Sequence, residues 1–119
     1  MLTCDPHSLA RAAEALPCLP LRANFYAAVL EQPLSSEEVC RHSDWCSRPL
    51  SANATEDCFI WLIRLGVLRR EVDGQGLTSR FRLTPLGRHL LDEQPDQLDR
   101  ATSIGERLRQ ALRRRWPQA

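Results

Sequence analysis

Four arginines that lie close together are the side chains of this chain best suited to bind an anion. They fall in the stretch "VLRREVDGQGLTSRFRLTPLG", residues 67–87. These arginines are Arg69, Arg70, Arg80 and Arg82. Arginine presents a planar fork of N–H donors that matches phosphate oxygens, and the hydroxyls of Thr78 and Ser79 suit nucleic-acid backbone oxygens. The residue types therefore predict a phosphate-binding surface. The alternative is a solvated strand surface that also carries Glu71 and Asp73.

Two short strands joined by a Gly-rich turn must position these arginines. Apolar and polar residues alternate over 67–72 and 77–83, and the turn residues 73–76 lie between them. The side chains predicted to share an apolar face on each strand are Leu68, Val72, Phe81 and Leu83. Because successive strand residues point to opposite faces, Arg80 and Arg82 are expected to point away from that apolar face.

The charge of the chain is concentrated around this hairpin. The whole chain has a net charge of only +1, with 43% hydrophobic and 26% charged residues, which is typical of a globular protein. Residues 61–90 carry a net charge of +4, whereas residues 1–60 carry −4 and residues 91–119 carry +1. The total charge does not indicate a nucleic-acid partner, but its distribution favours one at the hairpin.

Helices are predicted on both sides of the hairpin. A helix from about 51 to 65 precedes it, and Gly66 supplies the helix stop. A shorter helix covers about 36–43, and a C-terminal helix covers about 96–116. The signals for helix starts are Asp5-Pro6, the capping box Ser35 to Glu38, Ser51 or Asn53, and Thr84-Pro85. The fold class predicted is mainly α with a small β-hairpin, in a single domain over residues 1–119.

The order of these elements resembles the winged helix-turn-helix fold. The resemblance covers residues 21–91, and its most specific part is "LIRLGVLRREVDGQGLTSRFRLTPLGRHLL". There an apolar helix stops at Gly, a two-stranded wing follows, and a Leu-Thr-Pro-Leu-Gly segment starts the next helix. A similar segment occurs in the winged-helix dimerisation domain of small-molecule O-methyltransferases, which does not bind DNA. The N-terminal and C-terminal helices are additions to this core.

The resemblance to winged-helix regulators implies binding to double-stranded DNA. In that family the helix before the wing enters the major groove, and the wing contacts the phosphate backbone. Here helix 51–65 would read the bases. Asn53 is suited to adenine, and Ser51 is suited to a phosphate or a base edge. The implied function is that of a transcription regulator of bacterial type.

An acidic and apolar surface on the same helix leaves a second interpretation open. Glu56 and Asp57 repel phosphates, and Ile60 and Trp61 are apolar where such a helix usually carries polar residues. The alternative function is a winged-helix interaction or dimerisation module without DNA binding. On that hypothesis a protein partner contacts Glu56, Ile60 and Trp61.

The C-terminal segment is predicted to form a homodimer interface. One stripe of the predicted helix 96–116 carries apolar residues at helical spacing. They are Leu98, Ala101, Ile104, Leu108 and Leu112. The basic tail "RLRQALRRRW" is suited either to DNA or to an acidic partner. It is also what the dipole at a helix C-terminus favours.

The remaining residues predict neither catalysis nor a bound cofactor. Five cysteines at irregular spacing do not form a disulfide framework, and "CRHSDWC" lacks a zinc-ligand spacing. Cys40 and Cys58 are expected to be small core residues, while a metal or redox role for Cys40, His42, Cys46 and Cys58 stays open. No histidine lies in a nucleophile motif, and no transmembrane or signal segment is evident. We therefore expect a cytoplasmic protein that is not an enzyme.

Overall fold

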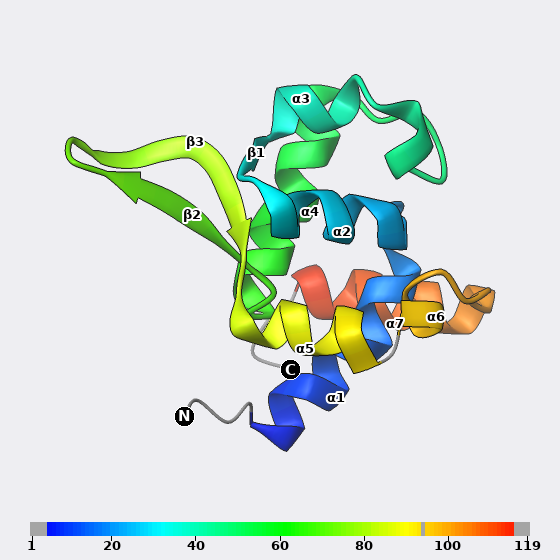
Figure 1. Cartoon of the computed structure of the whole chain (residues 1–119). Coiled ribbons are helices and arrows are strands. Elements are labelled where there is room, and N and C mark those ends of the chain that lie inside the picture. The colour runs from blue at the N-terminus through cyan, green and yellow to red at the C-terminus, as the bar shows by residue number, and fades with distance from the viewer. Residues whose placement is uncertain (1–4, 94, 116–119) are drawn as a thin grey trace.

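The computed structural model describes residues 5–93 and 95–115 and is mainly α-helical with a three-stranded antiparallel sheet (Figure 1). The helices are α1 (Pro6–Ala15), α2 (Ala23–Glu31), α3 (Ser36–Cys40), α4 (Ala52–Arg64), α5 (Pro85–Glu93), α6 (Pro95–Leu98) and α7 (Ile104–Arg115). Short 3-10 turns cover Leu16–Cys18 and Ser43–Trp45. In the described residues no helix is long and apolar enough to cross a bilayer.

Local side-chain caps explain where several helices begin and end. The Asp5 side chain accepts a hydrogen bond from the Ser8 amide at the start of α1. Ser35 and Glu38 form a full capping box at α3, as the sequence predicts. Ser51 caps α4, and Gly66 ends the helix region with a φ of 84°, a left-handed conformation that glycine adopts at little cost.

The predicted hairpin is present, and a third strand joins it. Strands β2 (Leu68–Asp73) and β3 (Gly76–Leu83) pair antiparallel, and the two-residue strand β1 (Leu34–Ser35) pairs with β3. The strand order is β1-β3-β2, and the hairpin projects away from the helices (Figure 1). The third strand was not predicted, since two residues are too few to show an alternating pattern.

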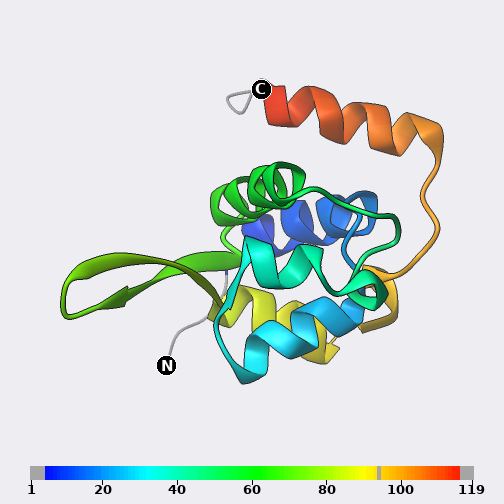
Figure 2. The ribbon, with the colours of Figure 1, turned by 90° about the horizontal axis from the view of Figure 1, so that it is seen from above.

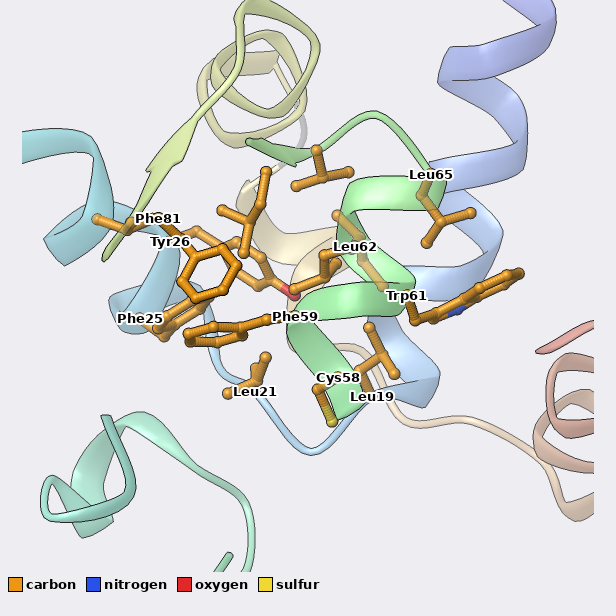
Figure 3. Packing of buried hydrophobic residues seen from close by; sticks show 14 of the residues in the cluster. Leu19, Leu21, Phe25, Tyr26, Cys58, Phe59, Trp61, Leu62, Leu65 and Phe81 are labelled. Carbon is orange, nitrogen blue, oxygen red and sulfur yellow. The ribbon is translucent and has the colours of Figure 1, made fainter. Parts of the chain in front are cut away.

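The core lies between the sheet and helices α1, α2, α4 and α5. The ring centroid of Phe59 is 5.6 Å from that of Phe25 and 4.7 Å from that of Phe81. Figure 3 shows these aromatic rings packed together on the side of α4 that faces β3. Phe81 is fully buried and anchors β3 to this core, as the alternation predicts. Val72 is exposed because it lies on the part of the hairpin beyond the helices, which corrects its prediction as an inward-facing residue.

The prediction of one C-terminal helix over 96–116 is wrong. The chain forms α6, leaves the helical conformation over 99–103, and starts again as α7; residue 116 lies outside the described residues. A carboxylate oxygen of Asp99 accepts a hydrogen bond from the Ala23 amide at 2.8 Å, which ties this break to the start of α2. Ser103 and Glu106 form a second capping box that begins α7. The predicted helix 36–43 also ends earlier, at Cys40.

Candidate functional site

The hairpin carries its arginines on two different faces. Arg70 points toward α4, where its guanidinium donates to Glu56 Oε1 at 3.2 Å and to the Thr78 carbonyl at 3.2 Å. The same group lies 4.4 Å from the centroid of the Phe81 ring. These contacts hold Arg70 in place and neutralise its charge, so it is not free to bind a phosphate.

The other face of the hairpin keeps most of its positive charge. Arg69 and Arg82 are direct cross-strand partners, and a carboxylate oxygen of Glu71 lies 2.7 Å from Arg82. Arg69 and Arg80 are exposed and form no ion pair with any described residue. Of the four predicted phosphate-binding arginines, these two are therefore the ones with unpaired charge on the outer face.

A cleft at the base of this outer face brings in a residue that the sequence did not single out. Arg69 and Arg82 line it together with Arg88 of α5, and its volume is about 300 Å³. Its other lining residues are Val29, Leu30, Leu83, Thr84 and Pro85. Arg88 was visible in the sequence only as one charge of the basic segment 61–90. Its position beside the hairpin depends on how α5 packs, and no local pattern encodes that.

The hydroxyl residues near the hairpin tip have different roles. Thr78 donates to the Glu71 carbonyl at 3.0 Å and accepts from the Arg80 amide at 3.2 Å, so its hydroxyl stabilises an irregularity in the ladder. Ser79 is exposed. The tip also presents the cross-strand pair Val72 and Leu77, both largely exposed. An apolar tip does not suit contact with a phosphate backbone.

Helix α4 presents a mixed outer surface. Ser51 accepts a hydrogen bond from the Ala54 amide at 3.1 Å, so its oxygen caps the helix, while Asn53 is exposed. Asp57 and Ile60 are also exposed. Trp61 is only 3% exposed, and Figure 3 shows it on the opposite side of α4 from Phe81. Its burial leaves a partner little of this side chain to contact, so the predicted contact at Trp61 stays a prediction.

Helix α7 lies beside the outer surface of α4. The two helices enclose a cleft of about 500 Å³, lined by Asp57, Ile60, Trp61 and Arg64 of α4 and by Ala111 and Arg114 of α7. Figure 2 shows α7 as a separate layer over α4 and α1. Arg113 pairs with Glu14 of α1 at 3.1 Å, and Gln110 is buried on the inner side of α7. This arrangement leaves the opposite side of α7 uncovered by the described residues.

That uncovered side of α7 carries most of the predicted dimer stripe. Ile104, Leu108 and Leu112 are 71%, 60% and 54% exposed, respectively. Ala101, in the segment before α7, is exposed as well. Leu98 is only 3% exposed and belongs to the core, so its assignment to a dimer interface is wrong. It ends α6, whose direction is separated from that of α7 by the break at 99–103.

The described residues contain no group of three or more side chains arranged to hold a metal ion. Cys46 and Cys58 are buried, as was expected for Cys58, whereas Cys40 is only half-buried. Burial raises the pKa of the Cys58 thiol above its ordinary value, and it does the same for Cys46. Raised pKa values keep these two thiols protonated and poorly nucleophilic at neutral pH.

The comparison with known proteins gives a family and no named relative. No curated protein and no solved structure matches the chain. The family described as Npun_F0494-like matches residues 2–114, which include α1 to α6 and nearly all of α7. Since that match covers almost the whole sequence, the chain belongs to the Npun_F0494-like family.

Proposed function

We propose that this chain is a winged-helix protein-interaction module that does not act through DNA binding, and that it forms a homodimer. The order α2, α3, α4, β2, β3 and α5 supports the winged-helix assignment, because it is the element order that the resemblance implies. On this proposal α4 and the hairpin form a folded scaffold, and α7 provides the contact surface.

The observation that carries the proposal is the stripe of Ile104, Leu108 and Leu112 on α7. These side chains follow one another at a spacing of four residues, and more than half of each is exposed in the described monomer. Burying apolar surface is favourable in proportion to its area. In a dimer with a two-fold axis, the stripe of one copy packs against the same stripe of the other copy. An antiparallel pair of α7 helices places Leu108 near the axis and Ile104 opposite the partner copy's Leu112.

The surface of α4 supports protein binding better than insertion into DNA. Its side toward the hairpin is neutralised by the pair Glu56–Arg70. Its outer side carries Asp57 together with exposed Ile60 and Ile63, and α7 lies next to it. A duplex would bring phosphates toward Asp57 and would leave the isoleucines against a polar groove, both of which are unfavourable.

Two measurements on the purified chain test the proposal. Sedimentation equilibrium should show a reversible dimer. A labelled random-sequence duplex should show no salt-sensitive binding at about 50 mM salt, where the counterion-release contribution to binding is large. A monomer at every concentration, or tight duplex binding that weakens steeply with salt, would contradict it.

DNA binding remains the second candidate, because Asn53, Ser79, Arg69 and Arg80 are exposed and together provide base-reading and phosphate-binding groups. On this hypothesis Arg80→Ala weakens binding to every sequence and lowers the salt slope by about one. Asn53→Ala instead changes the sequence preference. If neither variant alters duplex binding, helix α4 and the hairpin do not form a DNA interface.

A further inference from the structure

Three guanidinium groups from three different elements surround the cleft at the base of the hairpin. Arg69 comes from β2, Arg82 from β3 and Arg88 from α5. Arg69 and Arg82 lie directly opposite each other in the ladder, and like charges at such positions repel. The described structure supplies one carboxylate, Glu71, which pairs with Arg82. Two positive charges at the cleft are therefore left without a partner among the described residues.

The other walls of the cleft are mostly apolar. Val29 and Leu30 come from the last half of α2, and Leu83 and Pro85 lie where β3 leads into α5. The single hydroxyl proton of Thr84 is shared between the Gly66 and Val67 carbonyls, and its oxygen accepts from the Gly87 amide, so it has no proton left to donate to an anionic ligand. Specific polar recognition in this cleft therefore rests on the arginines.

We propose that this cleft binds a small phosphate monoester, with the phosphate between Arg69 and Arg88 and an apolar group against Leu30 and Leu83. A phosphate accepts paired hydrogen bonds from guanidinium groups and relieves the repulsion between them. It also lies near the N-terminus of the nine-residue helix α5, where the helix dipole favours negative charge. The volume of about 300 Å³ is at the lower end of the range for small-molecule sites, which fits a small ligand.

This site is distinct from the surface on which the protein-binding proposal rests. The cleft lies on the face of the hairpin opposite Arg70 and α4, and no described side chain of α7 lines it. A phosphate ligand here requires neither the dimer nor insertion of α4 into DNA. Failure of the dimer proposal would therefore leave this one standing, and the reverse is also true.

The test is calorimetric titration of the full chain with phenyl phosphate and, separately, with inorganic phosphate at about 50 mM salt, where screening is moderate. We expect saturable one-to-one binding of phenyl phosphate, tighter than that of inorganic phosphate because of the apolar walls. Arg88→Gln should weaken binding at least about tenfold, since hydrogen bonds to a charged group are lost. Glu71→Gln should strengthen it, because Arg82 is released from its ion pair.

Arg80→Gln is the matched control. It removes the same charge from the same face of the hairpin but lies outside the cleft lining, so affinity should stay within about twofold of the wild type, as expected for a screened distant charge. Arg88 is exposed, and the melting temperature without ligand checks that its variant is folded. Absence of saturable binding, equal losses in the Arg80 and Arg88 variants, or binding of a DNA duplex but not of phenyl phosphate would each overturn the proposal.

Discussion

Replacing Leu108 by Ala should weaken the proposed dimer without affecting the monomer. Leu108 is 60% exposed in the monomer and lies at the centre of the α7 stripe, with Ile104 and Leu112 one turn away on either side. Complete burial of a leucine side chain stabilises by roughly 2 kcal/mol. The atoms that Leu108→Ala removes are only partly exposed in the monomer, so their burial in the dimer contributes about 1 kcal/mol per copy. Both copies lose this contribution, and about 2 kcal/mol corresponds to a rise of about 30-fold in the dissociation constant.

Sedimentation equilibrium over a range of protein concentrations measures that change directly. Leu77→Ala is the matched control, because Leu77 is 74% exposed on the hairpin, and the substitution deletes the same atoms far from α7. The control should dimerise like the wild type. The reasoning is refuted if Leu108→Ala dimerises as well as the control, or if the wild type is monomeric at about 100 μM, a concentration that corresponds to only about 5.5 kcal/mol of binding.

Two further predictions concern the monomer. Gly87→Ala should destabilise the fold by about 1–3 kcal/mol in urea denaturation despite the better helix propensity, because the new Cβ would lie 2.7 Å from the Val67 carbonyl oxygen and 2.6 Å from Leu83 Cδ1. Gly105→Ala in α7 should not destabilise it, because the new Cβ would make only an ordinary contact, 3.9 Å from Ser103 Oγ. The hydrogen bond from Arg100 lowers the pKa of Glu106 below 4.5. The ionised Glu106 carboxylate therefore stabilises the folded chain above pH 4.5, and this stabilisation is lost as the pH falls through the lowered pKa. An NMR titration measures the pKa of the Glu106 carboxyl, and amide exchange in α7 measures the accompanying loss of stability. A titration midpoint at or above pH 4.5 would contradict the Arg100 contact.

Helix boundaries set by short-range chemistry were predictable from the sequence. The capping box of Ser35 and Glu38, the cap at Ser51 and the stop at Gly66 all depend on residues within a few positions of one another. The hairpin was equally accessible, since the alternation around Phe81 and the turn glycines lie within one stretch of the chain. These signals were enough to place the arginines on strands and to place Arg80 and Arg82 on the outer face.

The C-terminal break shows where that reasoning fails. Apolar residues from Leu98 to Leu112 fit a helical period, and period alone does not reveal that the helix is interrupted. The interruption depends partly on the bond between Asp99 and Ala23, which are 76 positions apart in the sequence. A local signal was present in Ser103 and Glu106, which have the spacing of a capping box inside the predicted helix.

The binding surfaces depended most on contacts that no local pattern encodes. A count of charges over 61–90 treats all arginines alike, whereas the fold pairs Arg70 with Glu56 and Arg82 with Glu71. One pairing neutralises the hairpin face toward α4. The pair Arg82–Glu71 compensates only one charge of the opposite face. Arg69 there has no ion-pair partner among the described residues and lines a cleft together with Arg88 of α5.

This division of charge separates the functions that the hairpin can support. A duplex bound by α4 would contact the hairpin face that Glu56 neutralises and the apolar hairpin tip. Strong DNA binding would therefore require phosphate contacts from the arginines on the opposite face of the hairpin. A small phosphate needs no such reach, because Arg69 and Arg88 already line one cleft. The outer face is therefore better suited to a compact anion than to a long one, and we propose that the exposed stripe of α7 binds protein.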